Sequence, residues 1–352
     1  MKVDKMGFLY PSVDLASCIE CHQCESVCPV IHQGTAREPL AAFAAINQDE
    51  DIRLKSSSGG IFTQLATIVF QKGGVVYGAM FNEHWEVIHD SVDSIEDIAR
   101  LRGSKYVQSN INDSFLATKF NLDNGRIVLF SGTPCQISAL RLFLKKAYTN
   151  LILVDVACHG VPSPLVWNDY LKEFGVNSIT SISFRDKRNG WNDYAYVIKC
   201  GENEALYQCH RKNIYSQGFL NDLTIRPSCF DCPAKAGKSG SDITLADFWG
   251  INSINCELND NKGINLLLAN TSRGLKMLYQ LEKSYLEKVD YAKAIQHNPA
   301  IVRSVLKPKS YDWFWRKYPH NGVNTIARAI KRMQPTCLHR IASRFVNLLT
   351  EN

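Results

Sequence analysis

The stretch RIVLFSGTPCQISALRLFLKKAYTNLILVDVACHGVPSPLVWNDYLKEF, residues 126–174, decides the fold. Arg126–Phe130 and Leu151–Ala157 are short apolar runs bounded by turn residues, which predicts two buried strands. Pro134–Lys146 and Pro164–Phe174 each begin with proline, which is typical of a helix start. Strands that alternate with helices in this way favour an α/β core with some parallel strand pairing.

The same alternation extends toward the N-terminus. Apolar spacing predicts a helix over Ile61–Gln71, and strands are expected over Gly74–Phe81 and Glu86–His89. Further helices are expected over Ile95–Leu101 and Phe115–Leu122. The segment Ala36–Lys55 holds an acidic patch and is interpreted as a connector.

The pattern changes after Ser178. Strands separated by turns predict a meander, and two later runs have the character of buried strands. The meander strands are Ile179–Phe184, Tyr194–Lys199 and Ala205–His210, and the later runs are Ile243–Asp247 and Ile264–Leu268. Leu275–Leu286 is expected to be helical. The last fifty residues are expected to be helical, basic and rich in aromatic residues, with Trp313, Trp315, Arg316, Arg328, Lys331, Arg340 and Arg344.

These elements predict an α/β to α+β fold built on a mixed-sheet core. We expect a ferredoxin-type segment over residues 1–38, the two parts of the core over 39–150 and 151–300, and a helical basic tail over 301–352. The default interpretation of the tail is an amphipathic helix packed on the domain, with partner docking as the alternative.

The composition is that of an ordinary globular protein. The chain has 352 residues, 45% of them hydrophobic and 21% charged, and a net charge of 40 − 34 = +6. This excess is too small to indicate nucleic-acid binding. No apolar run approaches the ~20 residues of a membrane helix, and no secretory signal is present, so a cytoplasmic protein is expected. Clustered cysteines in that compartment indicate metal or redox chemistry.

The first cysteine motif is C-x2-C-x2-C-x3-C-P, formed by Cys18, Cys21, Cys24 and Cys28. This is the spacing of bacterial ferredoxins and predicts a 4Fe-4S cluster, with a zinc knuckle as the alternative. In two-cluster ferredoxins the fourth cysteine ligates the other cluster, and this chain has a single motif. The module therefore looks halved, and either Cys28 or a remote cysteine could supply the fourth ligand.

A second cysteine set follows elements of the core. Cys135 lies between a predicted strand and helix, Cys158 follows a buried strand, and Cys229 and Cys232 form a C-x2-C pair. The carboxyl ends of neighbouring parallel strands coincide in space, so these four thiols could assemble one site. From spacing alone, iron–sulfur and zinc occupancy remain open.

Taken together, the motifs resemble the beta subunits of coenzyme F-420-reducing hydrogenases and formate dehydrogenases. The resemblance rests on Ser58–Gly60, Arg102–Ser109, Gly132–Gln136, Cys158–Pro164 and Cys229–Gly250, which occur in the family's order. It implies an iron–sulfur flavoprotein in which Cys135, Cys158, Cys229 and Cys232 hold the core 4Fe-4S cluster. It also implies FAD near Ser58, Gly59, Gly60 and Lys105. Tyr106, Thr133 and His159 are further candidate cofactor-binding residues, with a loop histidine that has satisfied hydrogen bonds as the alternative for His159.

The residues themselves suit a flavin to different degrees. A Ser-Gly run before a helix offers free N–H groups to a pyrophosphate, although such residues also cap helices routinely. No G-x-G-x-x-G follows a strand, so a Rossmann site is not expected. Lys105 could balance phosphate charge or polarise the flavin ring. Tyr106 and Trp249 could cover the ring, but aromatic residues at strand ends are more often core.

The function expected from this resemblance is that of an iron–sulfur flavoprotein oxidoreductase. FAD would exchange a hydride with a small organic donor or acceptor, coenzyme F-420 being a candidate, and pass electrons through one or two clusters to a redox partner protein or ferredoxin. In such a protein the positive net charge would compensate the anionic cofactors. The alternatives are a zinc-binding docking protein and an electron-transfer subunit without a substrate of its own.

Overall fold

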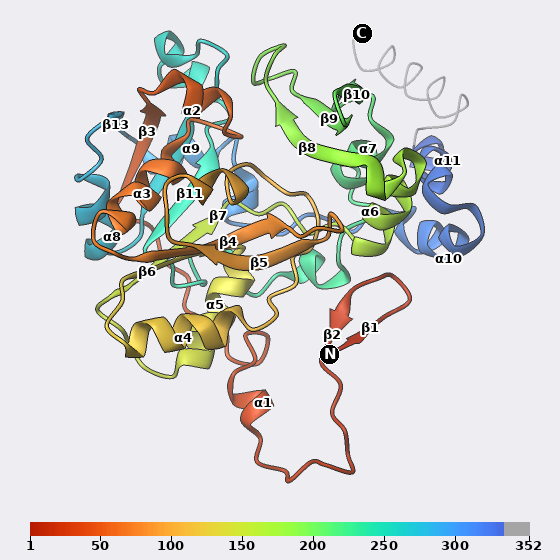
Figure 1. Cartoon of the computed structure of the whole chain (residues 1–352), viewed down its shortest axis with the longest axis horizontal. Helices are drawn as coiled ribbons and strands as arrows, with labels where there is room; N and C mark the ends of the chain where they lie inside the picture. The colour runs from red at the N-terminus through yellow and green to blue at the C-terminus, as the bar shows by residue number, and fades with distance from the viewer. Residues whose placement is uncertain (334–352) are drawn as a thin grey trace, which may run out of the picture.

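The computed structural model describes residues 1–333, and its core is one mixed sheet of eight strands (Figure 1). The strand order across the sheet is β13-β3-β12-β11-β7-β6-β4-β5. The strands are β3 (Ala41–Asn47), β4 (Val75–Phe81), β5 (Val87–Val92), β6 (Val128–Gly132), β7 (Leu151–Val156), β11 (Ile243–Asp247), β12 (Asn265–Ala269) and β13 (Ser284–Val289).

The centre of the sheet is parallel, as the alternation of strands and helices predicts. Strands β4, β6, β7 and β11 pair in parallel, whereas the outer pairs are antiparallel. The predicted helices are present as α5 (Pro134–Leu144) and α6 (Pro164–Leu171). Ser163 caps α6 because its hydroxyl accepts the N–H groups of Leu165 and Val166.

Helices cover both faces of this sheet. Helices α3 (Ile61–Phe70) and α8 (Ser272–Leu278) pack on one face, and α4 (Ser114–Asp123), α5 and α9 (Tyr291–Ile295) pack on the other. Strand β3 shows the alternation this requires, since Phe43 and Ala45 join one core cluster and Ala42 and Ala44 the other. Burial on both faces explains the continuous apolar runs of the central strands.

The predicted meander forms a second unit beside the sheet. Its strands are β8 (Ile179–Asp186), β9 (Ala195–Cys200) and β10 (Asn203–Cys209), and α6, α7 (Ile214–Leu220), α10 (Tyr311–Asn321) and α11 (Thr325–Met333) pack around it. Its core is aromatic, with Trp167, Phe184, Tyr215 and Phe314 fully buried.

The predicted helical tail is confirmed over the described residues as the pair α10 and α11. Trp315 is buried in the aromatic core, and α11 carries basic residues in its last turn. No helix within residues 1–333, this pair included, is long and apolar enough to cross a membrane. Arg340 and Arg344 lie outside the described residues.

Three secondary-structure predictions are wrong. The segment interpreted as a connector, Ala36–Lys55, holds β3, a buried strand between β12 and β13, and the short helix α2 (Glu50–Leu54). Alanine has low strand propensity, so only the pairing with two neighbours makes this run a strand. The helix expected over Leu275–Leu286 ends at Leu278, and the chain then forms edge strand β13, while Ile95–Leu101 contains only a 3-10 turn.

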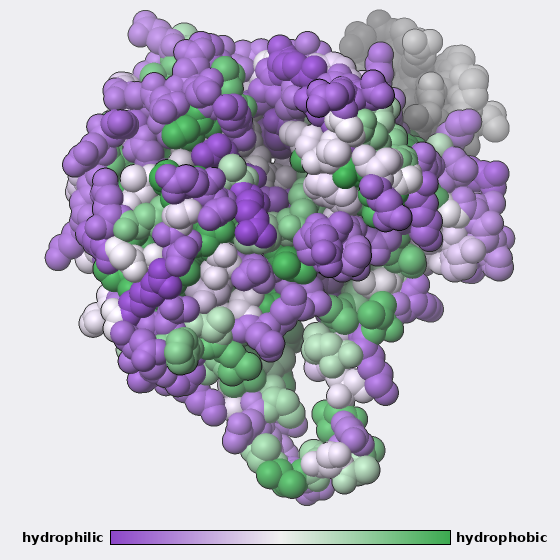
Figure 2. Space-filling model, in the orientation of Figure 1, coloured by the Kyte–Doolittle hydropathy of each residue, from purple (hydrophilic) through white to green (hydrophobic). Residues whose placement is uncertain are grey.

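The N-terminal segment is anchored to the body by a small hairpin and then leaves it. Strands β1 (Lys2–Val3) and β2 (Leu9–Tyr10) flank Phe8, which is fully buried against Trp315. The following arm carries the first cysteine motif and helix α1 (Gln23–Ser26), and it projects from the molecule (Figure 1). Figure 2 shows apolar side chains at the arm's surface, where Leu15 and Ile19 are each 85% exposed.

Candidate functional site

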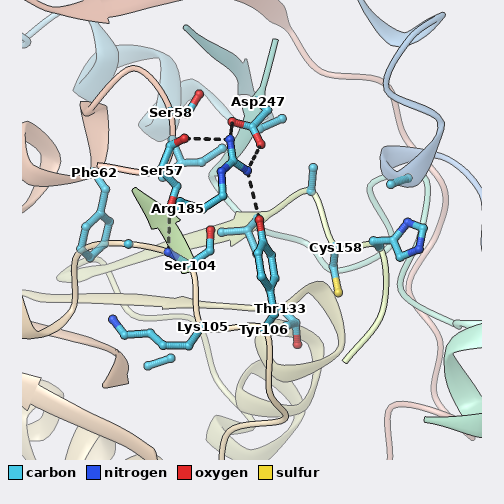
Figure 3. A pocket seen from close by; sticks show the side chains of 18 of the residues that line it. Ser57, Ser58, Phe62, Ser104, Lys105, Tyr106, Thr133, Cys158, Arg185 and Asp247 are labelled. Carbon is cyan, nitrogen blue, oxygen red and sulfur yellow. Dashed lines mark hydrogen bonds and ion pairs between the residues drawn. The ribbon is translucent and has the colours of Figure 1, made fainter. Parts of the chain in front are cut away.

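A cavity of about 510 Å³ lies where the carboxyl ends of β6, β7 and β11 face the start of α3 and the meander (Figure 3). This is the edge at which open α/β sheets bind ligands. Most of the residues predicted to bind the cofactor line it: Ser58, Gly60, Lys105, Tyr106, Thr133 and His159, together with Cys158 of the second cysteine set. Segments that are far apart in the sequence thus line the same cavity.

The loop before α3 has every carbonyl turned into the protein. The donors are Arg185 Nη2 to Ser57 O (2.9 Å), Lys187 Nζ to Ser58 O (2.9 Å), Asn47 N to Gly59 O (2.8 Å) and Asn47 Nδ2 to Gly60 O (3.1 Å). Two of these donors are buried cations from the meander strand β8 and its end. The orientation of the loop is therefore set by tertiary contacts.

The backbone N–H groups of this loop are left open. Within residues 1–333, none of the four N–H groups of Ser57–Gly60 donates to an acceptor, and the next one, that of Ile61, donates to Asn265 Oδ1 (3.2 Å). They lie at the N-terminal end of α3, where the helix dipole favours negative charge. The loop can therefore hold an anion such as a phosphate group.

The two glycines of this loop are required for different reasons, Gly59 by close packing and Gly60 by its backbone conformation. A Cβ on Gly59 would stand 2.5 Å from Ala45 O and 2.7 Å from Asn265 N, which are backbone atoms of β3 and β12. Gly60 has a φ of +85°, a left-handed conformation that glycine adopts at little cost. Gly59 does not itself line the cavity, so its contribution is the close approach of the loop to the sheet.

Arg185 is the central polar residue of the cavity, and sequence reasoning missed it. Its guanidinium pairs with Asp247 (Nη1 to Oδ2, 2.9 Å) and donates to the hydroxyl of Tyr106 (3.0 Å) (Figure 3). Burial acts most strongly on the pKa of Arg185 and lowers it, but Asp247 together with Tyr106 and Tyr194 more than offsets this effect, so the pKa is raised. A charged residue next to Phe184, at the end of a predicted half-buried strand, was the available signal.

Lys105 lines the cavity. Its Nζ donates to the carbonyls of Arg100 (2.9 Å) and Arg102 (3.1 Å), and burial lowers its pKa to about 7. Arg102 also lines the cavity and donates to Thr63 Oγ1 (3.1 Å). The cavity therefore carries more positive than negative side chains, which suits an anionic ligand.

Aromatic side chains form another part of the wall. Tyr106 stacks on Phe219 at 4.9 Å between ring centroids, and Trp249 stacks on Trp191 at 4.6 Å with nearly parallel rings. His159 and Asp222 are in hydrogen-bond contact, with 2.6 Å between Nε2 and Oδ1. Flat apolar faces beside polar groups are the ordinary lining of a cofactor pocket.

The second cysteine set meets at the edge of this cavity. Cys135 opens α5, Cys158 follows β7, and Cys229 lies in a 3-10 turn with Cys232 just after it. Burial raises the pKa of the Cys135 and Cys158 thiols, and raises that of Cys229 to about 11. The neighbouring thiols of the set raise each of these pKa values further, so the four groups lie close together.

Lys235 is a cation among these thiols that sequence reasoning did not identify. Its buried amine donates to Cys158 O and to Ala300 O (2.6 Å). Its charge lowers the pKa values of Cys158 and Cys229, against the effect of burial. A cation at this place can balance the negative charge of a metal–thiolate centre.

The second cysteine set supplies four soft thiol donors, the ligand type that both iron–sulfur clusters and zinc accept. Among residues 1–333 no three His, Cys, Asp or Glu side chains converge as ligands of one metal ion. A zinc site draws its ligands to about 2.3 Å from one point, whereas a cube of iron and sulfur keeps its thiolates further apart. Four soft thiols are, by their chemistry, a donor set that a 4Fe-4S cluster can use.

The first cysteine set lies on the arm, and its thiols do not converge either. Cys18, Cys21 and Cys24 are exposed and Cys28 is half-buried. Glu20 and His22 adopt left-handed backbone conformations, and the N–H of Glu20 donates to Cys18 Sγ (3.4 Å). One N–H of this loop is thus directed to a sulfur, a contact of the kind that tunes iron–sulfur clusters, and the identity of the fourth ligand stays a prediction.

Comparisons with known proteins agree with the resemblance seen in the sequence. Residues 42–115 match the N-terminal model, and residues 125–294 the C-terminal model, of the family "Coenzyme F420 hydrogenase/dehydrogenase, beta subunit". A stretch of 139 residues is 27% identical to a subunit of the F(420)H(2) dehydrogenase of Methanosarcina mazei and covers 39% of each chain. The match thus spans about two fifths of that relative.

A solved structure shares the fold. A chain of the F420-reducing [NiFe] hydrogenase complex from Methanosarcina barkeri superimposes with a TM-score of 0.51 at 14% sequence identity, covering 84% of this chain and 93% of that chain. The two family models cover both the sheet and the meander, including nearly every segment that surrounds the cavity. The chain therefore belongs to the family of beta subunits of the coenzyme F-420 hydrogenases and dehydrogenases.

Proposed function

We propose that this chain is an iron–sulfur flavoprotein oxidoreductase that exchanges electrons between a small organic hydride donor or acceptor and a redox partner protein. The observation that carries the proposal is the loop Ser57–Gly60. Its carbonyls are all bound, its N–H groups are open, and it faces a cationic cavity that borders four clustered thiols.

In this proposal the cavity holds FAD. The open N–H groups at the start of α3 bind the diphosphate, and Ser58 and Gly60 supply part of that surface. Arg185 keeps the loop in place through Ser57 O and is itself held by Asp247. Lys105, with its pKa near 7, can donate or accept a proton at the cavity wall, and Tyr106, Thr133 and His159 complete the lining.

The four half-buried thiols would hold a 4Fe-4S cluster next to this cavity. A flavin exchanges hydride with organic molecules, and an iron–sulfur cluster transfers single electrons. Cys158 lines the cavity and also belongs to the thiol set, so this residue joins the two sites. Lys235 compensates charge there, and the exposed set on the arm, Cys18–Cys28, offers a second cluster at the surface for a partner.

Coenzyme F-420 is the proposed small-molecule partner. The relatives that the chain resembles carry this coenzyme in their names. Arg102, Lys105 and Arg185 line the cavity, where Asp247 is the one carboxylate among the lining residues of the described range 1–333. An anionic deazaflavin would therefore be accommodated electrostatically. A protein partner, either a ferredoxin or another subunit, would exchange electrons at the arm.

Cofactor stoichiometry on anaerobically prepared protein tests the proposal. We expect about eight iron atoms, equal acid-labile sulfide and one FAD per chain if both clusters form. Cys135→Ser should remove one cluster and Cys21→Ser the other, whereas the control Cys200→Ser should remove neither. Zinc without sulfide, or colourless protein without flavin, would overturn the proposal, and absence of F-420 turnover with both cofactors present would overturn only the substrate.

A further inference from the structure

Thr133 stands between the cavity wall and one of the proposed cluster ligands. Its Oγ1 lies 3.2 Å from Cys135 Sγ and 3.1 Å from Gln136 Oε1. A hydroxyl has a single hydrogen to donate, so it can serve only one of these two acceptors at a time. A thiolate bound to iron accepts hydrogen bonds and donates none, so the destination of this hydrogen matters.

The amide of Gln136 leaves the hydroxyl free to turn to the sulfur. Gln136 Oε1 already accepts the backbone N–H of Thr133 (2.9 Å), and Gln136 Nε2 donates to Ser109 Oγ (2.8 Å). The carbonyl end of the amide is therefore satisfied without the hydroxyl of Thr133. The amide is also fixed in one orientation, because its oxygen has to face the backbone N–H of Thr133, and its nitrogen therefore faces Ser109.

A buried histidine fixes the direction of the remaining hydrogen bonds. Ser109 Oγ accepts from Gln136, so its hydrogen is donated to His89 Nδ1 (2.8 Å). The other ring nitrogen, Nε2, donates to Ser131 O (3.0 Å). The ring is buried and stacks on Phe130, and desolvation lowers its pKa to about 4, which keeps it neutral. Each polar hydrogen in the network from His89 to Thr133 then has one acceptor, and the acceptor for the Thr133 hydroxyl is Cys135 Sγ.

We propose that Thr133 donates an O–H···S hydrogen bond to Cys135 and thereby raises the reduction potential of the core cluster, with Gln136 and Ser109 as positioning residues. The inference rests on the proposed function, since it assigns Cys135 to a cluster. Reduction adds one electron and thus negative charge to the cluster and its thiolates. A hydrogen bond to sulfur stabilises that charge, and such bonds are known to tune cluster potentials.

Redox titration of anaerobically prepared protein, followed by electron paramagnetic resonance, tests this role. Thr133→Val removes the hydroxyl at nearly constant volume and should lower the midpoint potential of the core cluster. We expect at least a tenfold change in the ratio of oxidised to reduced cluster at a fixed potential, which is 59 mV for one electron. Thr133→Ser keeps the hydroxyl and should keep the wild-type potential.

Two further variants make the result specific. Ser109→Ala releases the Gln136 amide and should shift the potential in the same direction by a smaller amount. Thr118→Val removes a buried threonine hydroxyl in α4 that has no partner within the described chain, and it should leave the potential unchanged.

The outcomes distinguish a failure of the Thr133 hydrogen bond from a failure of the proposed iron–sulfur function. Equal potentials in wild type, Thr133→Val and Ser109→Ala would overturn this inference while leaving the cluster in place. If Thr133→Val assembles no cluster, the potential of Ser109→Ala decides, with a wild-type value counting against the hydrogen bond. Wild-type protein without iron and sulfide would refute the proposed function itself.

Discussion

Replacing Arg185 with methionine tests whether one buried ion pair organises the cavity. The pair is bidentate, with 2.9 and 3.3 Å between Arg185 and Asp247, and the side chains are 4% and 19% exposed. Removal of one partner of a buried pair costs about 3–5 kcal/mol because the other charge is left uncompensated. Asp247 keeps some solvent and the indole N–H of Trp191 (3.1 Å), so we expect the lower end, about 3 kcal/mol.

A double variant separates the lost charge pair from lost packing. Arg185→Met combined with Asp247→Leu removes both charges and should restore stability to within about 1 kcal/mol of wild type, since buried pairs replaced by apolar residues are often neutral. Arg185→Lys keeps one charge without the planar fork and should lie between the two. Ser57 O loses its donor in Arg185→Met, so flavin content should fall in that variant as well.

The assay is equilibrium urea unfolding followed by tryptophan fluorescence, with flavin content measured on the same preparations. The free energy of unfolding is extrapolated for wild type, Arg185→Met, Asp247→Leu and the double variant. The four values are compared as a double-mutant cycle. A free energy of unfolding for Arg185→Met within about 1 kcal/mol of the wild-type value would refute the role of this ion pair. It is refuted equally if the double variant loses as much stability as the sum of the single ones.

Three further predictions follow from the site. Gly59→Ala places a methyl group 2.5 Å from Ala45 O, so it should lower the free energy of unfolding in urea by about 1–3 kcal/mol and also lower the flavin content. The control Gly103→Ala has open space around it and should lose only about 1 kcal/mol, because its backbone is left-handed. Equal losses of stability in the two variants would contradict this prediction. Burial lowers the pKa values of Lys105 and Lys187 to about 7, so between pH 7 and the ordinary lysine range the unfolded chain binds protons that the folded chain does not. Stability should therefore rise with pH across this window, and Lys105→Met or Lys187→Met should flatten the rise in urea midpoints; an unchanged slope in both would refute the assignment. Cys158→Ser should remove the iron of the core cysteine set and also disturb flavin absorbance, because Cys158 borders both sites. Cys229→Ser should remove the iron with less effect on the flavin. Identical flavin spectra in the two variants would count against Cys158 as a residue shared by the two sites.

Much of the fold could be predicted from local pattern. The runs around Leu151–Val156 and Val128–Gly132 are apolar throughout because both faces of a parallel strand are covered, and prolines mark the starts of α5 and α6. The strand Ala41–Asn47 was missed because alanine carries little strand signal, and β13 was missed because an edge strand shows little beyond its pairing.

The candidate site could be predicted only at residues that belong to a recognisable local motif. Cysteine spacing indicates metal chemistry directly, whereas a Ser-Gly run before a helix is by itself more often a helix cap than an anion site. Arg185, Lys187 and Lys235 carry no such signal, since lysine and arginine are ordinary surface residues until a fold buries them. Their roles depend on partners 62 to 134 residues away in the chain.

The sequence by itself determined the family, the alternation of strands and helices, and the two cysteine sets, because spacing and periodicity are local properties of the chain. Only the tertiary structure decided which groups meet. It brings Cys135, Cys158 and the C-x2-C pair together, and it turns the carbonyls of Ser57–Gly60 into the protein, two of them onto buried cations, so that the N–H groups stay open. The physical reason is that burying a charge requires a partner, and the fold alone determines where that partner lies.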